Sequence, residues 1–265
     1  MANPLGSFIW YELMTTDPDG AAAFYGPIVG WTISGKPDPA AGDVDYRHIT
    51  RGDGGGNGGV LALTEEMCKG GARPCWLGYL YVADVDAAVK AIEADGGKLL
   101  MPAFSIEVGR IALVADPQGV PIYVMTPIPP AGVEDATSDV YSRWAEQHVS
   151  WNELFSPDLE AAKRFYARHF NFEFNESMPM GPMGDYCFID HGGETIGAMM
   201  QKPEQVPMGL WNFYIRVPDI DAAVAKVKEL GGQVLNGPME VPGGERIING
   251  MDPQGAPFSL VAKGS

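Results

Sequence analysis

Two glutamates occupy the same place in a four-residue motif that occurs twice. The first copy is Trp10-Tyr11-Glu12-Leu13 and the second is Trp151-Asn152-Glu153-Leu154. Each motif lies in a short apolar run typical of a strand, so Trp and Glu, two positions apart, share one face. An inward carboxylate is costly unless it is paired or hydrogen-bonded. Glu12 and Glu153 are therefore candidates for a general base or for a hydrogen-bond acceptor toward a ligand.

Two arginines at matching positions leave a structural alternative open. Arg110 and Arg246 each precede the last turn of their copy. A guanidinium can clamp a ligand carboxylate through two parallel hydrogen bonds, or it can neutralise a buried glutamate. The sequence therefore allows Glu12 and Glu153 to be structural partners of these arginines or of backbone donors.

Aromatic side chains recur on the predicted strands. Their flat faces suit the stacking of a planar or apolar ligand, and they suit an ordinary core equally well. His48, two residues after Tyr46 on the same strand face, is a candidate proton shuttle or a surface residue. The other candidate ligand-binding residues are Trp10, Tyr46, Trp76, Tyr79, Tyr123, Trp151, Tyr186, Trp211 and Phe213.

The motif belongs to a repeat that extends over almost the whole chain. The helix start Asp84-Val85-Asp86-Ala87-Ala88-Val89 returns as Asp219-Ile220-Asp221-Ala222-Ala223-Val224, and the turn Asp116-Pro117-Gln118-Gly119 returns as Asp252-Pro253-Gln254-Gly255. This order predicts two homologous domains, at 1–126 and 147–265. The proline-rich and polar segment 127–146 is predicted to link them.

Each domain contains the same pattern of elements twice. In the first domain a strand is followed by a helix that Asp17 can cap. Gly30 suits the left-handed position at the end of this helix, and Asn171 suits the matching position in the second copy. Strands are expected near 31–35, 44–50, 59–64 and 76–82, a helix after Asp84, and strands near 98–103, 110–115 and 120–126. The fold class is therefore α+β, built from four β-α-β-β-β units.

These features resemble the vicinal-oxygen-chelate superfamily, which includes glyoxalase I, extradiol dioxygenases and bleomycin-resistance proteins. The resemblance rests on Trp-x-Glu-Leu in both first strands, the Asp-Val-Asp-Ala-Ala helix start and the Asp-Pro-Gln-Gly hairpin. It implies mixed sheets that curl into a cup, with the site on the concave face. The same fold carries lyases, isomerases, dioxygenases and non-catalytic drug binders.

The resemblance also implies where a metal would be held. Metal-dependent members take His, Glu or Gln ligands from the first, fifth and last strands of a domain. Here the fifth strands offer Trp76-Leu77 and Trp211-Asn212, and Tyr123 and Ser259 replace the glutamate of the last strand. A tight divalent site needs three or four N or O donors. The prediction is therefore no metal and no other cofactor.

Composition excludes several classes of partner. The chain has 265 residues, and 18 Lys and Arg against 34 Asp and Glu give a net charge of −16. Such a charge repels phosphate backbones and anionic membranes. No signal peptide or spanning apolar run is visible, which predicts a cytoplasmic protein without nucleic-acid or membrane partners. Two domains can pair within one chain, so both a monomer and a homodimer remain open.

One glycine-rich stretch has no counterpart of equal length. Residues 52–59 contain six glycines, whereas the matching turn in the second copy is His191-Gly192-Gly193-Glu194. The stretch lacks the Lys-Ser/Thr ending of a phosphate loop. It is predicted to be a mobile hairpin that can act as a lid.

The function most compatible with these features is metal-independent binding of a small molecule, in the manner of glyoxalase-like and bleomycin-resistance proteins. The alternative is a glyoxalase-like lyase or isomerase in which Glu12 or Glu153 acts as base on a small oxo compound, with or without a metal. A scaffold protein is a third hypothesis.

Overall fold

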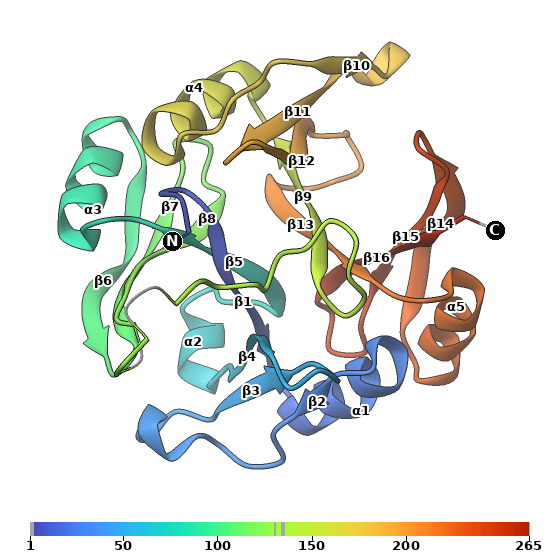
Figure 1. Ribbon diagram of the computed structural model, residues 1–265, viewed down its shortest axis with the longest axis horizontal. Coiled ribbons are helices and arrows are strands. Elements are labelled where there is room, and N and C mark those ends of the chain that lie inside the picture. Colours follow the sequence, from blue (N-terminus) through green and yellow to red (C-terminus); the bar gives the residue numbers. More distant parts are fainter. Residues whose placement is uncertain (1–2, 130, 134–135, 265) are drawn as a thin grey trace. The chain divides into compact units, whose positions relative to one another are not determined.

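The computed structural model describes residues 3–129, 131–133 and 136–264, and it confirms the α+β class (Figure 1). Each sequence repeat contributes one eight-stranded mixed sheet, with strand orders β2-β3-β4-β1-β5-β8-β7-β6 and β10-β11-β12-β9-β13-β16-β15-β14. The first repeat contains β1 (Phe8–Thr15), α1 (Pro18–Val29), β2 (Thr32–Ile33), a 3-10 turn (Pro39–Ala41), β3 (Tyr46–Thr50), β4 (Gly56–Ala62), α2 (Glu65–Lys69), β5 (Cys75–Tyr81), α3 (Val85–Ala94), β6 (Lys98–Ile106), β7 (Gly109–Ala115) and β8 (Pro121–Pro127).

The second repeat follows the same order without a counterpart of α2 among its described residues. In both sheets the first strand pairs in parallel with the fourth, and the third and fourth are antiparallel. The elements are β9 (Val149–Ser156), α4 (Leu159–Phe170), β10 (Ser177–Pro179), a 3-10 turn (Gly181–Met183), β11 (Asp185–His191), β12 (Glu194–Gln201), β13 (Leu210–Arg216), α5 (Ile220–Glu229), β14 (Gln233–Val241), β15 (Glu245–Met251) and β16 (Pro257–Lys263).

The predicted helix caps are confirmed. The Asp17 carboxylate accepts a hydrogen bond from the backbone N–H of Gly20, which satisfies one of the free donors at the start of α1. At the helix ends, Gly30 has φ +87° and Asn171 has φ +57°. Both are left-handed conformations that glycine and asparagine tolerate best. Local sequence therefore fixes where these helices begin and end.

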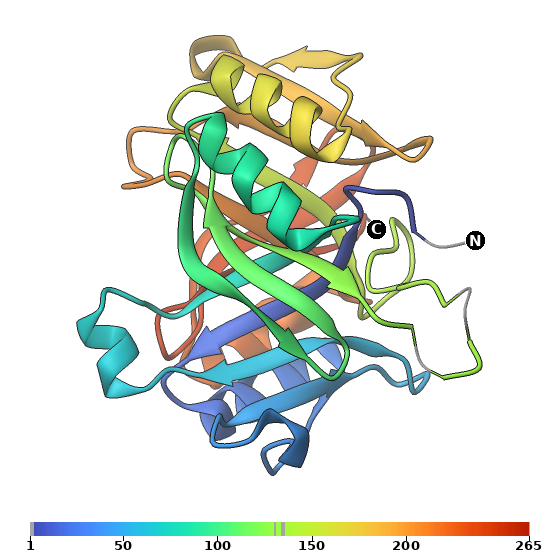
Figure 2. The same ribbon diagram turned by 90° about the vertical axis from the view of Figure 1, so that its left-hand side faces the viewer.

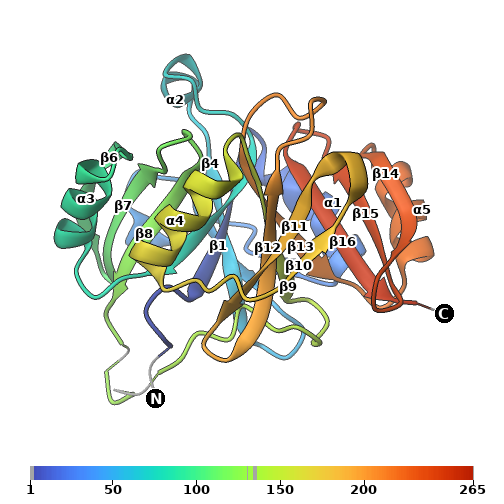
Figure 3. The same cartoon turned by 90° about the horizontal axis from the view of Figure 1, so that it is seen from above.

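The chain divides into two compact units, and each combines segments of both repeats. The first unit comprises the described residues of 1–9, 77–138 and 151–211, and the second comprises those of 10–76, 139–150 and 212–265. Within the first unit, α3 and α4 lie side by side (Figure 2), and Arg168 pairs with Asp95 at 2.6 Å. Within the second, α1 lies against α5 (Figure 3).

A buried tyrosine fastens a helix to a turn in the first unit. The Tyr166 hydroxyl on α4 donates to Oδ2 of Asp116 at 3.3 Å and accepts from Nε1 of Trp211 at 3.0 Å. Asp116 also accepts hydrogen bonds from the backbone N–H groups of Gln118 and Val120, which shapes the Asp-Pro-Gln-Gly turn. Burial raises the pKa of the Asp116 carboxyl. The repeated turn is thus a docking point for a helix.

The second unit contains the matching arrangement. The Tyr25 hydroxyl on α1 donates to Oδ2 of Asp252 at 3.0 Å and accepts from Nε1 of Trp76 at 3.1 Å. Burial raises the pKa of Asp252, as it does for Asp116. In each unit, therefore, a helix from one repeat is joined by its tyrosine to the turn of the other repeat.

The prediction of a mobile hairpin over 52–59 is wrong for its second half. Residues 56–59 belong to β4, because that strand starts at Gly56. A Cβ at Gly58 would overlap the backbone carbonyl of Tyr11, and a Cβ at Gly59 would overlap the hydroxyl of Tyr46. Glycine is required there by close packing within the sheet.

Among the described helices, none combines the length and the apolar character needed to cross a membrane.

Candidate functional site

A chain of hydrogen bonds joins three side chains in the second repeat. Trp151 and Glu153 come from β9, and Tyr186 comes from β11. Trp151 Nε1 donates to the Tyr186 hydroxyl at 2.8 Å, and that hydroxyl donates to Oε1 of Glu153 at 2.8 Å. Glu153 is buried, with 5% of its surface exposed. The tyrosine thereby supplies one of the donors that a buried carboxylate requires.

The intervening strand explains how the tyrosine reaches the glutamate. Strand β12 lies between β9 and β11, and its residue Ala198 pairs with Glu153 on one side and with Phe188 on the other. Side chains at paired positions lie on the same face. The small alanine side chain leaves room for the Tyr186 ring to extend over β12 toward Glu153.

The first repeat contains the same combination of residues. Trp10 Nε1 donates to the Tyr46 hydroxyl at 2.7 Å. Gly59 of β4 takes the place of Ala198, pairing with both Glu12 and His48. Glu12 is buried, with 2% exposure. Burial and then the charge of Glu12 raise the pKa of Tyr46, so its hydroxyl remains protonated and able to donate.

We call these two sets of residues the Trp–Tyr–Glu clusters. The first comprises Trp10, Tyr46 and Glu12, and the second comprises Trp151, Tyr186 and Glu153.

The clusters differ at one neighbouring position. His48 and Phe188 occupy equivalent places, and each ring meets the tryptophan of its cluster edge-on at 6.2 Å between centroids. His48 Nε2 also lies 2.8 Å from Oδ2 of Asp38. That hydrogen bond lowers the pKa of Asp38. The first cluster therefore has a polar, titratable edge where the second is apolar.

Besides Tyr46, the titratable group of Cys75 is also affected by Glu12. Burial and then the negative charge of Glu12 raise the pKa of the Cys75 thiol to about 12. A thiol with such a pKa is protonated at neutral pH and is a poor nucleophile. Thiolate chemistry is therefore not expected at this position.

The remaining aromatic candidates lie in two other settings. Tyr79 and Tyr123 are paired across β5 and β8, and their buried rings stack at 4.2 Å with an interplanar angle of 14°. Trp76 and Trp211 donate to the helix tyrosines described above, and Phe213 meets Tyr11 edge-on at 5.0 Å. These last contacts are those of core aromatic residues.

The two candidate arginines do not pair with the glutamates, so the prediction of an arginine–glutamate pair is wrong. Arg110 forms two hydrogen bonds of 2.7 Å to Asp86, and Arg246 bonds Asp221 at 2.6 and 3.0 Å. Both aspartates follow a helix cap in the repeated Asp-x-Asp-Ala-Ala motif, so the pairing is itself repeated. The hydrogen bonds raise the pKa of each arginine and occupy its guanidinium. The predicted binding of a ligand carboxylate by these arginines therefore has no direct support.

The donor set of the clusters does not fit a divalent metal. Each cluster offers one carboxylate, and Tyr186 already donates to that of Glu153. No group of three or more His, Cys, Asp or Glu side chains in the described ranges is arranged to hold an ion. A protonated tyrosine and an indole are not the N and O ligands from which tight divalent sites are built.

The chemistry available to a cluster is hydrogen bonding beside a flat apolar wall. A carboxylate accepts several hydrogen bonds, and a tyrosine hydroxyl has two acceptor positions besides its one donor. The tyrosine's role as a link was not visible in the sequence, which places Tyr46 and Tyr186 only on a strand face. The Asp38 partner of His48 was also missed, because it lies in a loop without a recognisable motif.

Comparison with known proteins identifies the family. The sequence profile of the Glyoxalase/Bleomycin resistance protein/Dioxygenase superfamily matches residues 7–124 and 147–260. The chain belongs to this superfamily. Both repeats are matched, which agrees with the duplicated clusters.

Full-length relatives share the two-repeat organisation. The chain is 31% identical to CFP32 of Mycobacterium bovis, a provisionally named glyoxylase, over 95% of this chain and 93% of that protein. It is 28% identical to the anthracycline biosynthesis protein DnrV of Streptomyces peucetius, over 97% of this chain and 93% of that protein.

Solved structures with the same fold are enzymes of different chemistry. A Mn(II)-bound glyoxalase from Novosphingobium aromaticivorans matches with a TM-score of 0.62 and 16% identity, over 98% of this chain and 83% of that one. The 2,3-dioxygenase LapB from Pseudomonas sp. KL28 matches with a TM-score of 0.62 and 14% identity, over 100% and 94%. At these identities the likeness concerns the fold alone.

Proposed function

We propose that this protein binds a small organic molecule at its Trp–Tyr–Glu clusters, and that it does so without a metal. The observation that carries the proposal is the hydrogen-bond chain from Trp151 through Tyr186 to Glu153. It connects a buried carboxylate to two aromatic side chains of the same repeat. Preorganised polar groups of this kind, few in number and set among aromatic walls, are typical of ligand sites.

The chemistry of the cluster restricts the ligand. Glutamate and the tyrosine hydroxyl accept hydrogen bonds, so the ligand should carry an O–H or N–H donor. Tryptophan offers a flat face, which favours a planar or apolar body. A negative charge beside Glu153 would be repelled. We therefore expect a neutral or cationic planar molecule, and the names of the relatives do not point to one compound class.

A thermal-shift screen of such molecules, followed by calorimetric titration of the hits, tests this proposal. Tyr46→Phe and Tyr186→Phe each remove one cluster's donor while keeping the ring. We expect one of them to weaken a hit about fivefold to tenfold, the effect of one net hydrogen bond. Tyr81→Phe, outside both clusters, is the matched control. If both Tyr46→Phe and Tyr186→Phe bind the hits as tightly as the wild type does, the proposal is wrong.

A second function is favoured by the burial of Glu12. A carboxylate with 2% exposure is poorly solvated, and a poorly solvated carboxylate is a stronger base. A glyoxalase-like lyase or isomerase would use it to remove a proton beside a carbonyl group. In that case Glu12→Gln or Glu153→Gln abolishes a turnover that the wild type shows on an α-oxoaldehyde or its thiol adduct. Absence of turnover by the wild type removes this candidate.

A further inference from the structure

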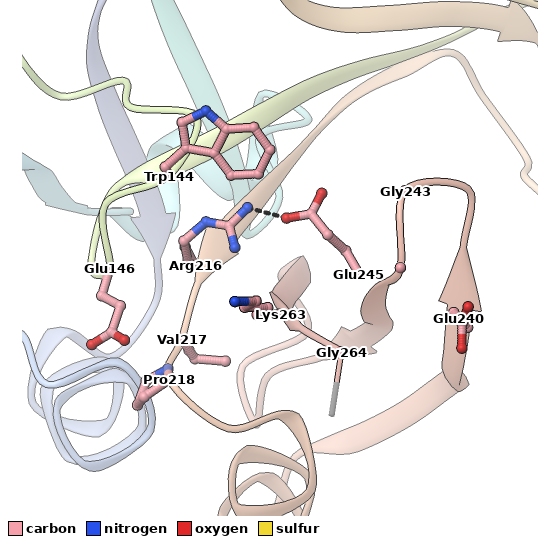
Figure 4. A pocket seen from close by; sticks show the side chains of 11 residues that line it. Trp144, Glu146, Arg216, Val217, Pro218, Glu240, Gly243, Glu245, Lys263 and Gly264 are labelled. Carbon is pink, nitrogen blue, oxygen red and sulfur yellow. Dashed lines mark hydrogen bonds and ion pairs between the residues drawn. The ribbon is translucent and has the colours of Figure 1, made fainter.

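A separate pocket of about 590 Å³ lies within the second compact unit (Figure 4). None of its lining residues belongs to a Trp–Tyr–Glu cluster. The lining comes from the segment 139–150, from the end of β13, from the β14–β15 hairpin and from the end of β16. The residues that matter for its chemistry are Trp144, Arg216, Glu245 and Lys263, together with Arg143 beside them.

Two arginines bind one carboxylate at this pocket, and a lysine lies on the neighbouring strand beside it. Glu245 accepts a hydrogen bond from Arg143 at 2.5 Å and another from Arg216. Lys263 is the direct cross-strand partner of Glu245 in the β15–β16 register, so the two side chains lie on one face. Burial by itself would raise the pKa of Glu245, but the two arginine hydrogen bonds outweigh it and the pKa is lowered. Glu245 is therefore ionised and leaves two positive charges in excess.

The other two carboxylates of the lining do not cancel this excess. Glu240 pairs with Arg246 in the β14–β15 register, and alternation along β15 places Arg246 on the face opposite to Glu245. Glu146 is exposed to solvent. In Figure 4 both side chains lie apart from the Arg216–Glu245 pair. A locally cationic pocket is unexpected on a chain with a net charge of −16.

One of these cations is buried with hydrogen-bonding capacity to spare. The Arg216 side chain is 6% exposed, and its buried Nε–H finds no acceptor in the part of the chain that the structure describes. A buried donor without a partner costs free energy. Lys263 takes part in no ion pair among the described residues. Its side chain is exposed, so its ammonium group is available to an anion.

Trp144 adds a flat apolar surface to the same pocket. Its indole lies over the guanidinium carbons of Arg143 and Arg216, with 4.4 and 5.5 Å to the ring centroid. Even so, 72% of the residue is exposed. An exposed tryptophan held in place by two arginines offers a preformed stacking surface beside the cationic groups.

We propose that this pocket binds a small aromatic carboxylate. The carboxylate group meets the Lys263 ammonium beside the positively charged Arg216 guanidinium, and the aromatic ring lies against Trp144. A guanidinium and an ammonium are the donors that recognise carboxylates, and the indole supplies the apolar contact. The site is independent of the Trp–Tyr–Glu clusters, which favour neutral or cationic molecules, so the two proposals can fail separately.

Titration with 2-naphthoate, followed by NMR of the indole N–H signals, tests the site. The chain has six tryptophans, and Trp144→Phe identifies the signal of Trp144 by its loss. We expect that signal to shift saturably with 2-naphthoate and not with the neutral 2-naphthamide. Lys263→Gln should raise the Kd about fivefold, the value of one partly exposed ion pair. Lys69→Gln changes the net charge equally at a residue outside the pocket lining and should leave the Kd unchanged.

Three outcomes would overturn the proposal. The first is a Trp144 signal that 2-naphthoate does not move. The second is an equal response to 2-naphthamide, which would show apolar contact without recognition of the carboxylate. The third is a Kd that Lys263→Gln and Lys69→Gln change to the same extent, which would reduce the effect to net charge.

Discussion

At the scale of single residues, a tyrosine hydroxyl is hydrogen-bonded to the buried Glu153. Tyr186 uses its one hydrogen toward Glu153 and accepts from Trp151, so the ring and the carboxylate are fixed together. A carboxylate held in this way is poised to accept a hydrogen bond from a ligand.

Glu245 provides a residue-scale test of electrostatics. Its pKa is lowered in the folded protein, so its contribution to stability is complete above the unfolded value of about 4.3 and is lost as the pH falls through the folded value. Glu245→Gln should lower the free energy of unfolding by about 1–3 kcal/mol at pH 7. The difference in the free energy of unfolding between Glu245→Gln and the wild type should be smaller at pH 3.5 than at pH 7.

Urea unfolding at the two pH values measures this difference, with Glu240→Gln on the neighbouring strand as control. Glu240 is exposed and is expected to change stability by less than about 0.5 kcal/mol. If the loss of stability in Glu245→Gln is the same at pH 7 and pH 3.5, the ion pairs of Glu245 with the two arginines do not contribute as proposed.

At the scale of elements, the helices were predictable because their signals are local. Asp17, Gly30 and Asn171 determine the helix ends through hydrogen bonds and dihedral angles that span a few residues. The docking of α4 on the turn at Asp116 was not predictable, since it joins residues 50 positions apart that share no sequence period. Likewise, the link from Tyr186 to Glu153 depends on the register of three strands, which no single strand encodes.

The two helix-docking tyrosines make a matched pair for mutation. Tyr166→Phe removes the donor to Asp116 and the acceptor for Trp211, and leaves the ring in the core. We expect a loss of about 1–3 kcal/mol in the free energy of unfolding, because buried polar groups lose a partner. Tyr25→Phe should have a similar effect in the other unit. Unfolding in urea measures these free energies, with Tyr81→Phe as control. If Tyr166→Phe and Tyr25→Phe each lower the free energy of unfolding by less than about 0.5 kcal/mol, the hydroxyls do not dock the helices.

At the scale of the whole molecule, duplication gives two copies of one cluster that have diverged at one position. His48 with Asp38 adjoins the first, and Phe188 takes the place of His48 beside the second. The sequence was sufficient to predict the two repeats and the mixed sheets. It was insufficient to show which groups hold the two glutamates, because Asp86 and Asp221, rather than the glutamates, satisfy the arginines.

The central claim is that the clusters hold no metal ion and that, in the second repeat, Tyr186 holds the carboxylate of Glu153 instead. Elemental analysis of untagged protein, purified from its native host without chelators, tests this claim most directly. We predict divalent metal far below one equivalent per chain, in the wild type as in Glu12→Gln and Glu153→Gln. About one equivalent in the wild type that is lost in either variant would contradict the claim and make a metal-dependent lyase or dioxygenase the leading function.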